Sequence, residues 1–235
     1  MKITQVSSYL TILLISFCLA LSTPSLLVSA NLNAAQSNTQ QEQNLFFLEN
    51  FTPPGDGQPK DTGFGGSRDD LSCSPQESSI RALMPQRNYG LTFSPHPAIF
   101  FYLPNTSAKQ IVVSFRDEAG KYFQRNIVPI KADTDITSAS LSNEQPSLEV
   151  GKNYQWSVGF VCGTALEPGN PTFAGWVQRV ESTAQITKEL AQKTHLEQVQ
   201  WYGAHGYWYD MLSAITQLES SSDAPLWQEI LTHLI

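Results

Sequence analysis

The segment that most constrains the fold is residues 148–156, which read Leu-Glu-Val-Gly-Lys-Asn-Tyr-Gln-Trp. Leu148, Gly151 and Tyr154 follow at intervals of three, and apolar residues then alternate along the chain. This pattern is typical of the corner that leads into an inner strand of an immunoglobulin-like or fibronectin-type-III-like sandwich. There the Tyr hydroxyl bonds to backbone just upstream while its ring enters the core. The pattern predicts a structural tyrosine corner and indicates no chemistry.

Strand signals separated by turn residues run from about residue 80 to 181, at the spacing of an all-β domain. An apolar stretch between Pro97 and Pro104 predicts a central strand. The turn sequence Asp-Glu-Ala-Gly at 117–120 predicts a hairpin loop. The predicted strands are 98–103, 110–116, 121–128, 135–141, 153–162 and 173–180. About seven strands in about 100 residues predict one sandwich.

From about residue 183 the apolar residues recur at helical spacing, which predicts four short helices. The middle two resemble one degenerate tetratricopeptide (TPR)-like hairpin, in which Tyr202, Gly206 and Trp208 match the repeat. One hairpin cannot form an array, so we expect the helices to pack on the sandwich or on each other. The apolar positions are Ile186 and Leu190; Leu196, Val199 and Tyr202; Trp208, Met211, Leu212, Ile215 and Leu218; and Leu226, Trp227, Ile230 and Leu234.

The predicted fold class is therefore α+β. It consists of an immunoglobulin/fibronectin-III-like antiparallel β-sandwich over residues 71–182, followed by a small C-terminal α-helical segment over residues 183–235. Residues 31–70 are rich in Gln, Asn, Ser, Pro and Gly. Such a composition buries too little apolar surface to order a long segment, so it predicts a flexible linker.

Residues 1–30 have the pattern of a secretory signal peptide: Lys2, an apolar run at 9–21, and Val-Ser-Ala at 28–30. The apolar run is shorter than the ~20 residues that span a bilayer. Cleavage after Ala30 would leave a periplasmic or secreted chain that does not span the membrane. An uncleaved membrane anchor is the alternative.

Export would remove Cys18 and leave Cys73 and Cys162, which predicts one disulfide in an oxidising compartment. In the chain-entropy model, closing a loop of about 90 residues stabilises a fold by about 4 to 5 kcal/mol. Cys162 falls on the same face of its strand as Tyr154 by period-two alternation. A metal site is the competing interpretation, but the four His residues show no ligand spacing. We expect no metal and no cofactor.

The charge balance argues against nucleic acid as a partner. The formal net charge is −7, and removing residues 1–30, which hold one Lys and no acidic residue, makes it −8. A chain this acidic without a basic stripe is poorly suited to phosphate backbones.

Two carboxylate pairs are the candidates for catalysis, since glycosidases use paired acids. These are Asp117 with Glu118, and Asp133 with Asp135. Both pairs fall at predicted turns, where Asp is favoured for local hydrogen bonding. We therefore predict no catalytic residue, and a cell-wall-acting hydrolase is the least favoured alternative.

The best candidate for a binding surface is the aromatic run at 201–209, because aromatic rings stack on sugars and anchor protein interfaces. On helices, such residues cannot all share one exposed patch. The repeat-like spacing places Tyr202 and Trp208 in the helical core, which leaves Trp201, His205 and Tyr209 as the predicted surface.

The whole pattern resembles the cyanobacterial proteins grouped as domain of unknown function 928. The resemblance runs from about residue 63 to 235 and rests on these segments: 65–68 (Gly-Gly-Ser-Arg), Cys73, 83–85 (Leu-Met-Pro), 90–92 (Gly-Leu-Thr), 97–104, 148–156, Cys162, 175–176 (Gly-Trp) and 202–212. The family offers no activity, catalytic residue or cofactor to transfer. It implies an exported protein with a β domain and a helical tail.

Together these observations predict a non-catalytic, protein-binding or adaptor module of the cell envelope. The alternative is a module that binds envelope polysaccharide through the aromatic run. The partner predicted is an envelope protein or polysaccharide, and not nucleic acid.

Overall fold

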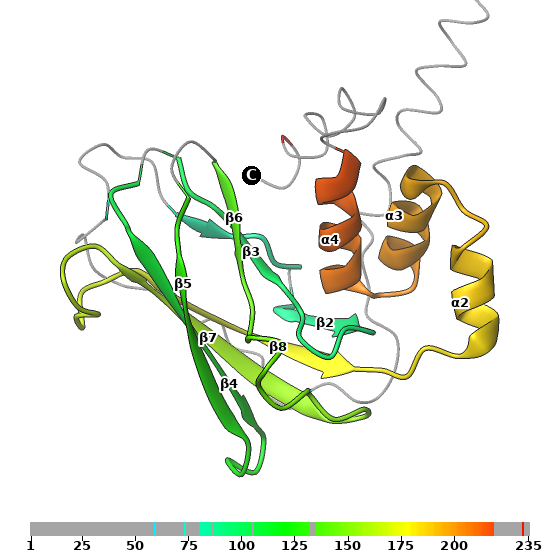
Figure 1. The fold of residues 1–235 in the computed structure, drawn as a ribbon, viewed down its shortest axis with the longest axis horizontal. Helices are drawn as coiled ribbons and strands as arrows, with labels where there is room; N and C mark the ends of the chain where they lie inside the picture. Colours follow the sequence, from blue (N-terminus) through cyan, green and yellow to red (C-terminus); the bar gives the residue numbers. More distant parts are fainter. Residues whose placement is uncertain are drawn as a thin grey trace, which may run out of the picture. The chain divides into compact units, whose positions relative to one another are not determined.

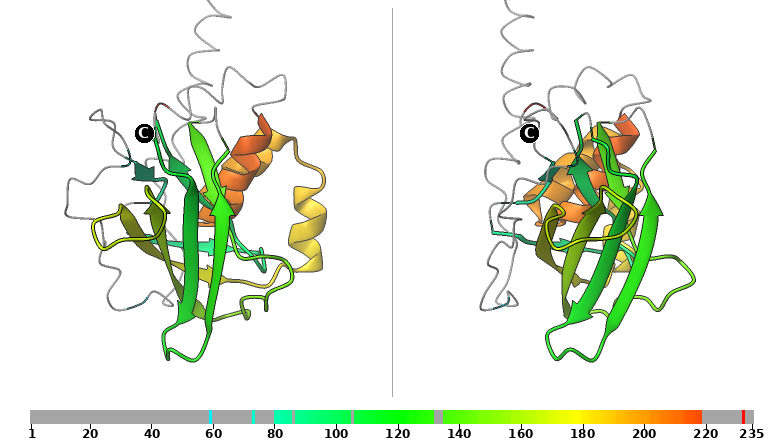
Figure 2. Two further views of the ribbon diagram at one scale, coloured as in Figure 1. Left: turned by 60° about the vertical axis from the view of Figure 1, so that its left-hand side comes forward. Right: turned by 90° about the vertical axis from the view of Figure 1, so that its left-hand side faces the viewer.

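Two β-sheets pack face to face, with helices beside one end of the larger sheet (Figures 1 and 2). The computed structural model describes residues 59, 73, 80–85, 87–104, 106–131, 135–218 and 232. The strands are β1 (Arg81–Ala82), β2 (Tyr89–Thr92), β3 (Ile99–Tyr102), β4 (Gln110–Asp117), β5 (Phe123–Pro129), β6 (Ile136–Ala139), β7 (Asn153–Val161) and β8 (Thr172–Arg179). The helices are α2 (Ala184–Leu190), α3 (His195–Ala204) and α4 (Trp208–Leu218).

The strand order is that of an immunoglobulin-like sandwich. One sheet has the order β1-β3-β6 and the other β2-β8-β7-β4-β5. When β2 is set aside, the first, second and fifth strands form one sheet and the other four form the second, as in fibronectin-type-III-like domains. All described pairs are antiparallel except β2 with β8. The predicted α+β fold class is confirmed, and so are the predicted hairpin and the central position of β3.

The core lies between the two sheets and follows from period-two alternation. In β7, Tyr154, Trp156, Val158 and Phe160 are all at most 2% exposed, as expected for one face of a strand. Phe101 from β3 meets the rings of Trp156 and Phe160 edge-on. The inward face predicted for β7 is therefore confirmed.

The tyrosine corner is present at residues 148–154. The Tyr154 hydroxyl accepts a hydrogen bond of 3.0 Å from the backbone amide of Glu149, and Leu148 and Tyr154 are fully buried. Gly151 has a φ of +79°, which explains why Gly stands at this position. Its amide donates to the carbonyl of Arg179 and so ties the corner to β8.

Cys73 and Cys162 form the predicted disulfide, with their Cα atoms 5.0 Å apart. Cys73 is buried in the main core, and its carbonyl accepts a hydrogen bond from the Ser107 hydroxyl at 2.6 Å. The bond therefore fastens the chain at residue 73 beside the end of β7.

Strand β2 was not predicted. All four of its residues are buried, because Tyr89 and Leu91 face a second apolar cluster while Gly90 lies against Trp208 of α4. A strand covered on both faces shows no alternation, and four residues give little other signal. Trp176 N donates to the Asn88 carbonyl next to this strand.

Helix α4 belongs to the same core as the sandwich. Its buried side chains Trp208, Met211, Leu212 and Ile215 join one apolar cluster with the inner faces of the sheets. The Trp208 indole N–H donates to the Leu83 carbonyl at 2.9 Å. Packing of the helices on the sandwich and on each other is thus confirmed for α4 and for the α3–α4 pair.

Several predictions lie outside the described residues. These are the signal peptide, the linker and the fourth helix with Leu226, Trp227, Ile230 and Leu234. Within the described ranges, no helix has the length and apolar character needed to cross a membrane.

Candidate functional site

The α3–α4 hairpin carries the aromatic run, and its turn sets where each ring points. Helix α3 begins with a capping box between Thr194 and Glu197. It ends where the Tyr207 amide bonds to the Tyr202 carbonyl and the Gly206 amide to the Gly203 carbonyl, a Schellman motif. Gly206 has a φ of +81°. The turn reverses the chain, so α3 and α4 present their rings to different surroundings.

Gly206 also covers the edge of the larger sheet. Its carbonyl accepts a hydrogen bond of 2.9 Å from the Leu91 amide of β2. The turn therefore satisfies part of the outer backbone edge of β2 and holds the hairpin to the sheet.

Tyr209 was predicted as a surface residue, and this is wrong. Tyr209 is 1% exposed, and its hydroxyl accepts from the Trp156 indole N–H at 2.7 Å and donates to the Trp176 carbonyl at 2.8 Å. Tyr209 is the second residue of α4, on the side of the helix that packs against the sandwich together with Trp208 and Leu212. Its burial raises the pKa of its hydroxyl. Tyr209 is a structural link between α4 and the sandwich.

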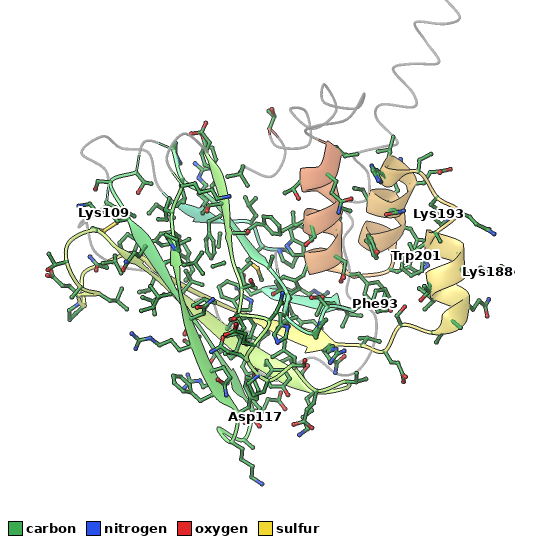
Figure 3. All side chains as sticks on the ribbon, viewed as in Figure 1. Phe93, Lys109, Asp117, Lys188, Lys193 and Trp201 are labelled. Atoms are coloured by element: carbon green, nitrogen blue, oxygen red, sulfur yellow. A yellow bond between two sulfur atoms is a disulfide. The ribbon has the colours of Figure 1, made fainter. Side chains whose placement is uncertain are left out.

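His205 is exposed, as predicted. Trp201 was predicted at the surface too but is only partly exposed, and so is Phe93 beside it. Phe93 follows β2, and its ring is 6.4 Å from that of Trp201 (Figure 3). His205 is exposed and stacks on Trp201 with ring centroids 4.1 Å apart, and its Nδ1 lies 2.7 Å from the Trp201 carbonyl. We call the side chains of Phe93, Trp201 and His205 the Trp201 surface.

A buried aromatic layer supports the Trp201 surface. Tyr207, 8% exposed, stacks on Phe93 at 4.0 Å and lies nearly parallel to Trp201 at 5.6 Å. Beneath these rings are Tyr89 and Leu91 of β2. The Tyr202 ring packs edge-on against Trp201. Tyr202 is partly buried, so the prediction that it lies in the core is confirmed only in part. The layer holds the exposed rings in fixed orientations.

Asp210 ties the Phe93 segment to α4. Its Oδ2 accepts a hydrogen bond of 3.1 Å from the Phe93 amide. Burial raises the pKa of this carboxyl to about 6, although hydrogen bonds from the Phe93 amide, the Thr92 hydroxyl and its own backbone amide favour the ionised form. The Asp210 charge adds to burial in raising the pKa of Tyr202 and of Tyr207. The carboxyl is a positioning group beneath the surface.

The predicted carboxylate pairs serve the β4–β5 turn where they are described. Asp117 Oδ1 accepts from the Lys121 amide at 2.6 Å, and Glu118 Oε1 accepts from the Asn153 side chain at 3.2 Å. Asp117 lies near the tip of the hairpin, away from Phe93 and Trp201 (Figure 3). Asp135 is exposed, and its partner Asp133 lies outside the described residues.

No metal centre is formed by the residues that the structure describes: no three His, Cys, Asp or Glu side chains there are placed to hold an ion. Cys73 and Cys162 are joined to each other.

The sequence analysis missed Phe93 and Asp210. Phe93 follows the strand that was not predicted, so nothing located it beside Trp201. Asp210 lies in the first turn of α4, where the helix dipole favours an acidic residue. Its position therefore did not indicate a further role. An acidic residue inside a dense aromatic run was the available signal.

The sequence matches the family described as Domain of Unknown Function (DUF928) over residues 63–234. The chain belongs to this DUF928 family. The match covers the sandwich and the helices together. No curated protein matches the chain. Among solved structures, it is similar to the fn3 domain of the human collagen alpha-1(XX) chain. That similarity has 10% identity and a TM-score of 0.29, and it covers 57% of this chain and 92% of the other.

Proposed function

We propose that this DUF928 protein is a non-catalytic adaptor of the cell envelope that binds another protein through the Trp201 surface. The signal-peptide pattern supports export, and the Cys73–Cys162 disulfide is of the kind that persists in oxidising compartments. In this proposal the mature chain acts in the periplasm or after secretion.

The observation that carries the proposal is the arrangement of rings at the Trp201 surface. The Trp201 ring stacks on His205, and Phe93 stacks on Tyr207. Rings that already stack on one another offer their edges and polar tips more than free faces. Aromatic residues held rigidly in this way serve as anchors of protein interfaces, because little side-chain entropy is lost on binding.

Polysaccharide binding at the same surface is the second candidate. It is supported by the partial exposure of Trp201 and by the ability of aromatic rings to pack on sugar rings. A sugar would need an open ring face, which the His205 stack restricts. A shift of tryptophan fluorescence on adding a panel of neutral glycans would favour it.

An enzymatic role is the least supported. Asp117 and Glu118 are engaged in hydrogen bonds at the hairpin turn. Replacing both with their amides should leave any cell-wall-degrading activity of the preparation unchanged, and loss of such activity would contradict a non-catalytic role.

The test of the adaptor role is affinity purification of the full chain from crosslinked envelope fractions, followed by mass spectrometry. The Trp201→Ala, His205→Ala variant should lose a protein that the wild type retains in stoichiometric amount. Lys188→Gln, an exposed change on α2, serves as the matched control and should retain it. The retained protein is then purified and titrated against both variants. An equal yield from wild type and double variant would refute the Trp201 surface as the binding site.

A further inference from the structure

The outer face of the five-stranded sheet carries a row of four large side chains. Strand register pairs Phe123 with Arg116, Arg116 with Gln155, and Gln155 with Trp176. Directly paired residues point to the same side of a sheet, so the four lie in one line across the strands. Their neighbours along the strands point into the core. With strands about 4.8 Å apart, the ends of the row are about 14 Å apart.

A second row beside the first has short side chains. Ser114 pairs with Ser157 and Ser157 with Ala174, and the two Ser hydroxyl oxygens are 2.7 Å apart. Arg125 stands at the end of this row, paired with Ser114. The row of large side chains from Phe123 to Trp176 therefore borders a row of small, mostly polar side chains.

The charges on this face differ from those of the chain as a whole. The chain has a net charge of −7. Among the described side chains that point outward from β4, β5, β7 and β8, two are arginine and none is acidic. One carboxylate reaches this face from the β4–β5 turn: Glu118 accepts a hydrogen bond from the outward side chain of Asn153, and its charge adds to burial in raising the pKa of Tyr89. The outward positions are Gln110, Val112, Ser114, Arg116, Phe123, Arg125, Ile127, Pro129, Asn153, Gln155, Ser157, Gly159, Val161, Thr172, Ala174, Trp176 and Gln178.

Gln155 holds the Arg116 guanidinium in place. Arg116 Nε and Nη2 donate to Gln155 Oε1 at 3.1 and 2.9 Å. A guanidinium has five N–H donors, so the bonds to Gln155 fix its plane and leave donors for a ligand. A guanidinium binds a carboxylate or sulfate through parallel hydrogen bonds. Arg116 is also exposed to solvent.

Phe123 supplies an apolar ring beside this cation. It is 62% exposed, and Ile127 on the same face of β5 is 51% exposed, so β5 presents two apolar side chains to solvent. Trp176, three strands away, is partly exposed, and the next residue of the row, Tyr89 of β2, is buried beside it. Two rings with cations between and beside them fit a ligand that has both flat apolar faces and negative charges.

We propose that this face binds an acidic polysaccharide, a chain of sugar rings that bear carboxylates. The chain lies across the strands, with sugar rings against Phe123 and Trp176 and carboxylates on Arg116 and Arg125. Among the described side chains at this face, Arg116 and Arg125 outnumber the one carboxylate, Glu118, and this balance favours an anionic over a neutral glycan. Two arginines are too few for a nucleic acid. Trp176 packs against the cluster of Tyr89, Leu91 and Tyr207 that also supports the Trp201 surface, so the two surfaces meet at β8 and β2. The arginines lie on β4 and β5, at the other edge of the sheet, and the proposal does not depend on the adaptor role.

The test is titration of the full chain with alginate oligosaccharides, which are polymers of uronic acids, in low salt with a chelator. Dextran serves as the neutral sugar and poly-L-glutamate as an acidic polypeptide. We expect binding to alginate that weakens as salt is raised, and at most weak binding to dextran and poly-L-glutamate. Arg116→Gln with Arg125→Gln should weaken alginate binding by about tenfold, because exposed charge pairs contribute modestly.

Two further variants distinguish the site from general charge effects. Phe123→Ala should weaken alginate binding by about threefold or more, since a ring that packs on the sugar is lost. Lys188→Gln, which removes one positive charge from α2, should leave it unchanged. Far-ultraviolet circular dichroism checks that each variant is folded. The proposal is overturned if wild type does not bind alginate, if dextran binds equally well, or if Lys188→Gln weakens binding as much as one arginine change. Equal binding of poly-L-glutamate with no effect of Phe123→Ala would assign the face to an acidic polypeptide instead.

Discussion

Helices α3 and α4 carry aromatic residues from one short run of sequence, but they use them differently. Trp201 of α3 lies at the surface beside Phe93 and His205. Tyr209 of α4 is buried and hydrogen-bonded to Trp156 inside the sandwich. The turn at Gly206 separates the two helices. Helix α4 therefore completes the core, while α3 contributes Val199 to the core and leaves Trp201 partly exposed.

The largest expected effect is the loss of the Tyr209 side chain. Tyr209→Ala should lower the free energy of unfolding by about 3 to 5 kcal/mol, through the cavity left behind. Tyr209→Phe should lower it by about 1 to 3 kcal/mol, because the Trp156 N–H and the Trp176 carbonyl lose their partner. Urea denaturation measures both. A Tyr209→Ala protein as stable as the wild type would show that Tyr209 is not a core residue and would remove the difference between α3 and α4.

The next effect concerns the contact between α4 and β2. A Cβ at Gly90 would lie 2.7 Å from the Trp208 Cβ, so Gly90→Ala must push α4 away from the strand. We expect a loss of about 1 to 3 kcal/mol in thermal or urea unfolding. Gly163→Ala is the matched control, because a Cβ there meets nothing within 4 Å and Gly163 is not among the glycines with positive φ. If Gly163→Ala costs as much as Gly90→Ala, the contact with Trp208 does not account for the loss.

A smaller effect is the pH dependence that Asp210 contributes. Its pKa in the folded protein is about 6, against about 4 in an unfolded chain. Its contribution to stability is therefore fully present below about pH 4 and is lost as pH rises through about 6. When pH is lowered from 7.5 to 4.5, the free energy of unfolding of the wild type should rise by about 1 to 2 kcal/mol more than that of Asp210→Asn. Parallel pH profiles of the two proteins by urea denaturation would contradict this account.

The smallest expected change in stability is that of Trp201→Ala. Its ring is partly exposed, so we expect a loss of about 1 kcal/mol or less in urea unfolding. The same variant should lose the envelope partner. A loss comparable to that of Tyr209→Ala would make Trp201 a core residue and remove the difference between the helices.

The sequence predicted features whose pattern repeats locally. Alternation in β7 located its buried face, and the intervals of Leu148, Gly151 and Tyr154 located the tyrosine corner. The pairing of Cys73 with Cys162 was predicted because export to an oxidising compartment would leave only these two cysteines. These features follow from residue identity and from the two-residue alternation of a strand, and both can be read from a single sequence.

The features that were not predicted depend on tertiary neighbours. Strand β2 is buried on both faces, so it lacks alternation. The burial of Tyr209 depends on which side of α4 meets the sandwich, and helical spacing alone does not determine this. Phe93 and Trp201 are more than a hundred residues apart, and only the pairing of β2 with β8 brings them together. The pair of Arg116 with Gln155 similarly depends on strand register.

The most direct test of the central claim is hydroxyl-radical footprinting of the full chain, read by mass spectrometry at Trp201 and Tyr209. In the isolated protein, Trp201 should be modified much faster than Tyr209. After addition of the partner retained from envelope fractions, Trp201 should become protected while Tyr209 is unchanged. Modification of Tyr209 as fast as Trp201, or no protection of Trp201 by the partner, would contradict the account.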